Sequence, residues 1–285
     1  MPPSVAIMAL GLCVAASPAA VRAQPVERPS RIVSLDLCAD QLLVELVDRK
    51  RIAAVTHLAA DPAVSSIPEM ARGIPITRGT AEDVLRYDPD LILAGPYGVS
   101  ETVDLLKRLK RNVTIVPLPS DLDGVRVAMR TVAAAVGERH KGEMMVSTFD
   151  KRVRIQLVTS EEKRPSAIVY QVGGTVSGSG SLAEAALIAA GFRNKAAEYR
   201  LTRNGQVPLE LLVAAPPDLL VLSSNAEEYR TAISDNLRNP VLARFKQEHA
   251  WVELPWQLWL CGTPRLADAI ERLVQAREKL RARTQ

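Results

Sequence analysis

The chain has 285 residues, of which 47% are apolar and 24% are charged, and its formal net charge is +4. This is the composition of an ordinary globular protein, and the length suffices for one large domain or for two lobes. The charge is small for this length and no long run of lysine or arginine occurs, so we expect no nucleic acid among the partners.

The first 23 residues have the pattern of a signal peptide. The apolar segment from Ile7 to Ala16 is too short to span a membrane, and small or modest side chains follow at 21–23. We therefore expect cleavage after Ala23 and an exported mature protein. Loss of Cys13 leaves Cys38 and Cys261, an even number that suggests one disulfide in an oxidising compartment.

Strands and helices alternate through the first half of the mature chain. The apolar runs and helical stripes predict strands at 31–36, 51–58 and 112–119, helices at 38–50 and 100–111, and a short helix, a proline break and a buried strand within 83–98. This alternation predicts a parallel α/β sheet, which forms a first lobe at 31–137.

Residues 121–162 interrupt the alternation with two consecutive helices. The first ends at Gly137, and the second is expected at 138–162. A helix of about 22 residues spans roughly 33 Å, which is enough to cross from one domain to another. We therefore interpret 138–162 as a linker helix.

The alternation resumes in a second lobe at 163–285. Strands are expected within 165–174, at the end of 208–224 and at 251–255, and helices at 180–192, at the start of 208–224, at 238–250 and from 263 onwards. The glycine-rich segment 173–181 lacks the lysine and the spacing of a nucleotide-binding loop, so we expect a loop at the edge of a cleft.

A sequence repeat relates the two lobes. EDVLRYDPDLIL begins at Glu82 and ELLVAAPPDLLV begins at Glu210, 128 residues later. Glutamate, proline, aspartate and leucine coincide without a gap, at positions 82/210, 89/217, 90/218 and 91/219. Each copy places a short helix ahead of a buried strand, so the repeat favours two lobes of one design.

These features together resemble one family, the periplasmic binding proteins of ABC importers for metal chelates, which include the ferric-siderophore, haem and cobalamin binders. The resemblance rests on the two lobes, the single linker helix and the repeated E-x6-P-D-L. It also rests on four further segments: RIVSLDLCADQLLVELV at 31–47, RPSAIVYQ at 164–171, GSLAEAALIAAGFRN at 180–194 and GTPRLADAIERL at 262–273. It covers about residues 30–281.

The resemblance implies a fold, a place and a set of partners. The fold is two α/β lobes with mostly parallel sheets joined by a single long helix, and the place is the periplasm. The partners are a small-molecule metal chelate, an ABC transporter permease and its ATPase, with the binding protein a monomer that needs no cofactor. Glu82 and Glu210 match the acidic residues that dock onto permease arginines.

The ligand of a two-lobe α/β protein sits between the lobes at the carboxyl ends of the strands. Aromatic faces there would stack on a bulky chelate, and arginines would pair with its oxygen atoms. Ser120 and Trp256 each follow a predicted strand and are therefore also expected near this site. Our candidates for ligand contact are Cys38, His57, Arg78, Tyr97, Gln171, Trp259, Cys261 and Arg265. With His57 the only histidine expected in the cleft, we expect no direct metal site.

Several alternatives remain open at this point. Cys38 and Cys261 form a disulfide, or face each other as thiols that touch the ligand, or are unrelated buried cysteines. The chelate is expected to be a ferric siderophore or a similar iron complex, with haem or cobalamin as the alternative. Two further alternatives do not involve transport. One is a secreted thiol enzyme that uses Cys38 and His57, and the other is a sensor or scaffold with the same fold.

Overall fold

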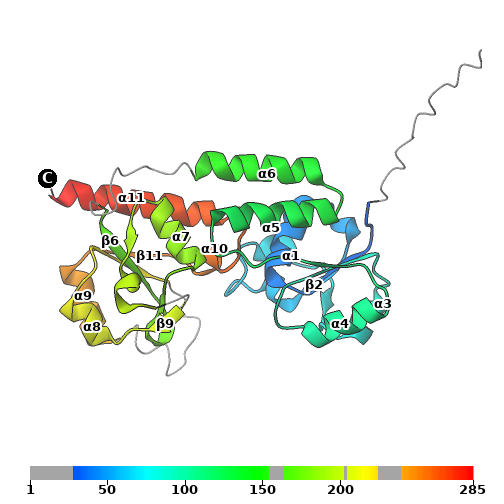
Figure 1. Cartoon of the computed structure of the whole chain (residues 1–285), viewed down its shortest axis with the longest axis horizontal. Coiled ribbons are helices and arrows are strands. Elements are labelled where there is room, and N and C mark those ends of the chain that lie inside the picture. The colour runs from blue at the N-terminus through cyan, green and yellow to red at the C-terminus, as the bar shows by residue number, and fades with distance from the viewer. Residues whose placement is uncertain (1–27, 154–163, 202–203, 224–238, 285) are drawn as a thin grey trace, which may run out of the picture.

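The computed structural model describes residues 28–153, 164–201, 204–223 and 239–284, and these form two α/β lobes side by side (Figure 1). The predicted fold class is therefore confirmed. The first lobe has a five-stranded sheet in the order β3-β2-β1-β4-β5, and every pair in it is parallel. Its strands are β1 (Ile32–Ser34), β2 (Ile52–Thr56), β3 (Ile76–Thr77), β4 (Leu91–Ala94) and β5 (Val113–Ile115).

Helices cover both faces of this sheet, which is why its central strands are apolar along their whole length. All residues of β1 and β4 are buried. The helices are α1 (Leu37–Leu46), α2 (Pro68–Ala71), α3 (Ala81–Arg86) and α4 (Ser100–Arg108). Asp36 starts α1, because its side chain accepts a hydrogen bond from the Ala39 backbone N–H at 2.9 Å.

The second lobe has a six-stranded mixed sheet. Its order is β11-β10-β6-β7-β9, with β8 beside β6. The strands are β6 (Ser166–Tyr170), β7 (Thr175–Ser177), β8 (Arg193–Asn194), β9 (Asn204–Gln206), β10 (Leu219–Leu222) and β11 (Trp251–Glu253). The helices are α7 (Leu182–Ala189), α8 (Leu209–Ala214), α9 (Pro240–Glu248), α10 (Gln257–Leu260) and α11 (Leu266–Thr284).

The expected loop at 173–181 contains a strand, β7, which corrects that interpretation. Gly173 and Gly174 have φ angles of 74° and 75°, which only glycine adopts easily. They turn the chain back, so that β7 pairs antiparallel with β6 and then with β9. The second lobe thereby gains an antiparallel edge that the first lobe lacks.

Two helices, α5 (Leu122–Ala135) and α6 (Arg139–Arg152), lie side by side along one edge of the molecule (Figure 1). At its start α6 is anchored on the first lobe, and at its end Arg152 forms ion pairs with Asp268 and Glu271 of α11 in the second lobe, at 2.5 and 2.8 Å. Its two ends therefore contact the two lobes. Residues 154–162 of the predicted linker helix lie outside the described residues.

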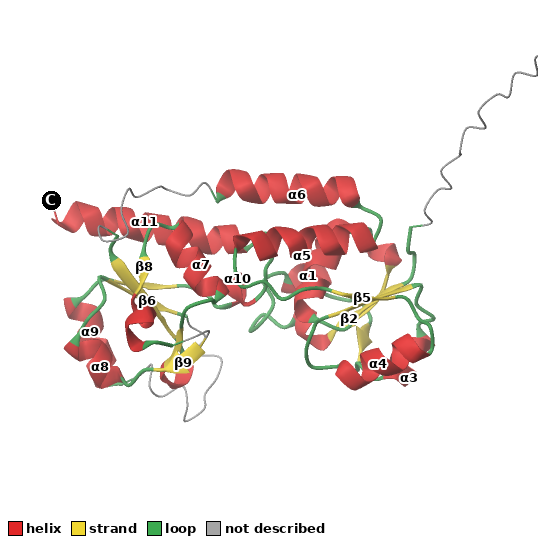
Figure 2. Ribbon diagram, viewed as in Figure 1, coloured by secondary structure: helices red, strands yellow, loops and turns green. Residues whose placement is uncertain are grey.

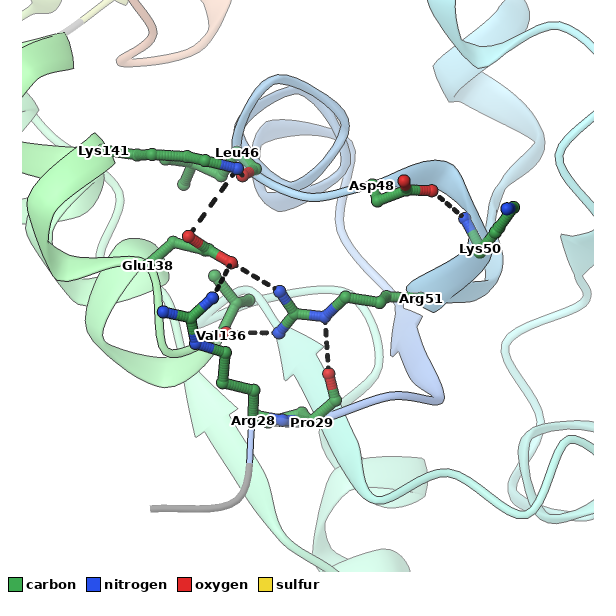
Figure 3. Close-up of polar contacts among 9 residues, drawn as sticks. All are labelled: Arg28, Pro29, Leu46, Asp48, Lys50, Arg51, Val136, Glu138 and Lys141. Carbon is green, nitrogen blue, oxygen red and sulfur yellow. Dashed lines mark hydrogen bonds and ion pairs between the residues drawn. The ribbon is translucent and has the colours of Figure 1, made fainter. Parts of the chain in front are cut away.

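The anchor at the start of α6 is a nearly buried carboxylate, Glu138 (Figure 3). Its side chain accepts a hydrogen bond from Arg51 at 2.7 Å and forms longer ion pairs with Arg28 and Lys141. The same Arg51 guanidinium donates to the backbone carbonyls of Pro29 and Val136. These contacts fasten the turn between α5 and α6 to the beginning of the first sheet.

The hydrophobic core is continuous across the two lobes on one side and divided on the other. Apolar residues of α1, α5 and α6 form a single cluster with those of α7, α10 and α11. The opposite face of each sheet has its own separate cluster, under α3 and α4 in one lobe and under α8 and α9 in the other (Figure 2). The shared cluster holds the lobes as one unit.

The repeated Pro-Asp-Leu has the same structural role in both lobes. Asp90 accepts hydrogen bonds from the Ser30 backbone N–H and hydroxyl at 2.7 and 2.8 Å, and Asp218 accepts the same pair from Ser166 at 2.6 and 2.7 Å. Each aspartate precedes a strand and clamps the start of the parallel strand beside it. The clamped serines lie in a second repeat, RPSRIV at 28–33 and RPSAIV at 164–169.

Within the described parts of the chain, no helix combines the length and the apolar character that a membrane crossing requires.

Candidate functional site: the cavity between the lobes

A cavity of about 370 Å³ lies between the two lobes, and both contribute to its wall. The first lobe supplies Tyr97 and residues 118–120 from the loops after β4 and β5. The second lobe supplies the remainder: Gln171, Ser177, Gly180, Ser181, Leu182, Ala183, Asn204, Trp256, Trp259 and Leu260. Gln171 directly follows β6, so the cavity lies where the carboxyl ends of the parallel strands predict a ligand site.

Three of the predicted ligand contacts, Tyr97, Gln171 and Trp259, line this cavity, together with Ser120 and Trp256. Tyr97 is 68% exposed on the first lobe, whereas Trp259 is only 5% exposed in the opposite wall. The Gln171 side-chain amide donates to the Ser177 hydroxyl at 3.3 Å, which orients both groups.

His57, Arg78 and Arg265, three of the predicted ligand contacts, do not line the cavity. His57 begins a short 3-10 helix after β2, and both it and Arg78 are exposed outside the lining. Arg265 forms an ion pair with Glu45 of α1 at 3.4 Å. Burial raises the pKa of the Glu45 carboxyl, and the charge of Arg265 opposes this shift. Arg265 thus serves a contact between the lobes.

Cys38 and Cys261 are joined by a disulfide bond across the lobes, with their Cα atoms 5.1 Å apart. Cys38 lies in the first turn of α1, and Cys261 lies just ahead of α11 in the second lobe. Neither residue lines the cavity. Of the three arrangements left open by the sequence, the structure contains the bridge.

The disulfide belongs to a longer seam, residues 256–265, along which the second lobe contacts the first. The Trp256 indole N–H donates to the Ala63 carbonyl at 2.8 Å, and the Gln257 side-chain amide donates to the Pro62 carbonyl at 2.7 Å. A Cβ atom at Gly262 would collide with the Pro119 ring. This seam fixes the position of the two tryptophans in the cavity wall.

Other residues of the cavity wall, such as Ser177 and Asn204, were not predicted from the sequence. The segment TVS at 175–177 carries a strand signal, β-branched residues after a pair of glycines, that could have indicated β7 and Ser177. Asn204 has no comparable local signal, because its place in the wall depends on the pairing of β9 with β7, which is distant in sequence.

No group of three or more histidine, cysteine, aspartate or glutamate side chains is arranged to hold a metal ion, as far as the described residues extend. The wall is instead aromatic, aliphatic and neutral polar. Such a surface can stack on a large ligand and donate hydrogen bonds to its periphery.

Comparison with known proteins identifies the family that this chain resembles. Residues 32–247 match the family model described as periplasmic binding protein. A cobalamin-binding protein of Halobacterium salinarum is 26% identical over 205 residues, which is 70% of this chain and 55% of that protein. The chain thus spans about half the length of the curated relatives that it matches.

Solved structures agree on the two-lobe fold. The periplasmic heme-binding protein RhuT from Roseiflexus sp. RS-1 superposes with a TM-score of 0.72 at 23% identity, over 88% of this chain and 98% of that one. The vitamin B12 binding protein BtuF of Vibrio cholerae superposes with a TM-score of 0.68 at 17% identity, over 89% and 98%. Since the family model matches most of the sequence, the chain belongs to the periplasmic binding protein family.

Proposed function

We propose that this protein captures a metal chelate, a ferric siderophore or a similar complex, in the cavity between its lobes and delivers it to an ABC importer in the inner membrane. The observation that carries this proposal is the cavity itself, which has aromatic side chains on both sides and no cage for a bare ion among the described residues. Structures described as a heme-binding protein, a vitamin B12 binding protein and an ABC-type Fe3+-hydroxamate transport system share the fold and support the ligand class.

Glu82 and Glu210 are the proposed docking points for the permease. Each is an exposed residue in the first turn of a short helix, α3 in one lobe and α8 in the other. Both helices lie on the side of the molecule opposite α6 (Figure 1). Two carboxylates on one side, one per lobe, can meet two permease arginines and set the orientation of the complex.

A simpler role for these glutamates is to stabilise the positive end of each helix. That role predicts a small loss of stability on substitution and no specific loss of transport. The two roles are therefore separable by experiment.

The test is the double charge reversal Glu82→Lys with Glu210→Lys. We expect loss of chelate uptake by cells that express the cognate importer, with unchanged chelate affinity of the purified variant. The matched control reverses two other exposed helix acids, Glu101 of α4 and Glu278 of α11. Uptake that falls equally in both double variants, or in neither, would reject these docking points.

The alternative of a secreted thiol enzyme has little support. The Cys38 sulfur is bonded to Cys261 and is not available as a nucleophile in this state. His57, the expected base, is exposed and lies outside the cavity wall. The arrangement therefore favours binding over turnover.

A further inference from the structure

The wall of the cavity between the lobes is uncharged as far as the described residues show. It combines the aromatic rings of Tyr97, Trp256 and Trp259 with aliphatic side chains and with the hydroxyl and amide groups of five residues: Ser120, Gln171, Ser177, Ser181 and Asn204. From this chemistry we infer that the cleft selects an uncharged chelate, with amide or hydroxamate groups on its periphery, over an anionic one. The inference rests on the proposed function and names the ligand class of the same site.

The two arginines expected to pair with anionic oxygens are placed elsewhere. Arg265 is paired with Glu45, and Arg78 stands outside the lining. The cavity therefore offers an anionic ligand hydrogen bonds but, within the described wall, no formal counter-charge.

An anion that leaves water for a partly enclosed cleft loses hydration, and this loss is offset only by a counter-charge or by strong donors. The carboxylates of haem and the charged oxygens of a ferric catecholate complex would bear that cost here. Amides and metal-bound hydroxamates lose less hydration and exchange it for hydrogen bonds with hydroxyl and amide side chains. Their apolar parts stack on the indole and phenol rings.

The neutral polar groups are also well held. Gln171 and Ser177 are hydrogen-bonded to each other, and the Ser181 hydroxyl donates to the Gly178 carbonyl and accepts from the Glu184 backbone N–H. A rigid set of neutral donors and acceptors discriminates by position, since it cannot rearrange to solvate an added charge.

The test titrates the purified mature protein with four probes, followed by tryptophan fluorescence and calorimetry. The neutral probes are cyanocobalamin and a ferric trihydroxamate, and the anionic probes are haemin and a ferric tricatecholate. We expect at least one neutral probe to bind about tenfold or more tightly than both anionic probes. Tighter binding of either anionic probe would overturn the inference and leave the proposed function intact, whereas binding of none would overturn both.

Charge insertion gives a second, independent readout. Ser120→Lys and Asn204→Lys each place a cation in the wall, one per lobe, at exposed positions. Either variant should raise the affinity for the anionic probes several-fold, by roughly 3- to 10-fold, with little change for the neutral ones. Ser147→Lys on the exposed face of α6 is the control and should change neither. An equal effect of all three substitutions would contradict a role of cavity charge.

Discussion

The two lobes share their framework and differ at the cavity. In both, a glutamate-bearing helix leads into a strand whose preceding aspartate clamps the neighbouring strand. Only the second lobe adds the antiparallel strands β7 and β9 and the seam 256–265. The duplicated parts build the fold and the proposed docking points, whereas the second lobe, which carries the unmatched parts, supplies most of the cavity wall.

This division separates the residues of the cavity wall from the proposed docking points. The first lobe contributes loop residues to the wall, whereas the second contributes Ser177 and Asn204 from strands and two tryptophans from the seam. Substitutions at the unmatched parts should alter binding, and substitutions at the matched parts should alter stability or docking. Three predictions probe this comparison through stability.

The largest effect is expected from loss of the disulfide that joins the lobes. Replacement of Cys38 and Cys261 by serine should lower the free energy of unfolding by up to roughly 5 kcal/mol, because the bridge closes a loop with a sequence separation of 223 residues. Denaturant unfolding of the two proteins measures the difference. Thiol titration of the unfolded, unreduced protein should find no free thiol from these two residues.

The same variant tests whether the lobes unfold as one unit. The hydrophobic cluster shared by α1, α5, α7 and α11 should keep unfolding a single transition even without the bridge. Two separate transitions in the serine variant would show that the disulfide alone couples the lobes.

The second prediction concerns Asp40 of α1, which is fully buried and accepts hydrogen bonds from the Thr56 backbone N–H and hydroxyl. Burial raises the pKa of Asp40 from 3.8 to about 8, against the opposing hydrogen bonds. The folded state then retains a proton that the unfolded state loses above pH 3.8. The contribution of Asp40 to stability should therefore fall as the pH rises from about 4 to about 8, by up to about 4 kcal/mol between pH 4 and pH 7 at 1.36 kcal/mol per unit.

Asp40→Asn removes this titration and retains an acceptor for Thr56. Unfolding free energies measured between pH 4 and pH 8 should be much flatter in the variant than in the parent protein. Equal slopes in the parent protein and in Asp40→Asn would contradict a protonated Asp40.

Most of the framework was predictable from the sequence, because long apolar strands and amphipathic helices carry a clear period. The sequence indicated β1, β4, β6 and β10 at close to their observed places. It missed β3 and β8, because strands of two residues have no measurable alternation. It also missed β9, whose pairing with β7 is made across a long separation.

The candidate site was predictable where a residue follows a strand closely or belongs to a rare type. Gln171 and Tyr97 were found by their place after strands, and Trp259 was found because tryptophan is rare in this chain. The sequence pattern does not show toward which side the side chain of a residue ahead of a helix projects. For this reason the sequence led us to expect Arg265 in the cleft. Its contact with Glu45 of α1 depends on how the lobes are joined, which is a tertiary property.

The smallest expected effect is the difference in stability loss between substitutions of Asp90 and Asp218, which occupy matching positions in the repeat. Ser166 is 2% exposed, whereas Ser30 is exposed. Asp218→Ala removes the acceptor of the N–H and of the hydroxyl proton of a buried serine, so it should cost about 1–3 kcal/mol. Water can replace Asp90 at the exposed Ser30, so the loss in Asp90→Ala should stay below about 1 kcal/mol.

The hydrogen bonds from Ser30 and Arg31 hold the pKa of Asp90 below its ordinary value, although partial burial by itself would raise it. Its small contribution should therefore disappear only in acid, as the pH falls through that lowered pKa. Denaturant unfolding at neutral pH compares the two alanine variants, with Asp218→Asn and Asp90→Asn as controls that keep one acceptor. Equal losses in both lobes would show that the clamp itself, and not the burial of the clamped serine, sets the energy.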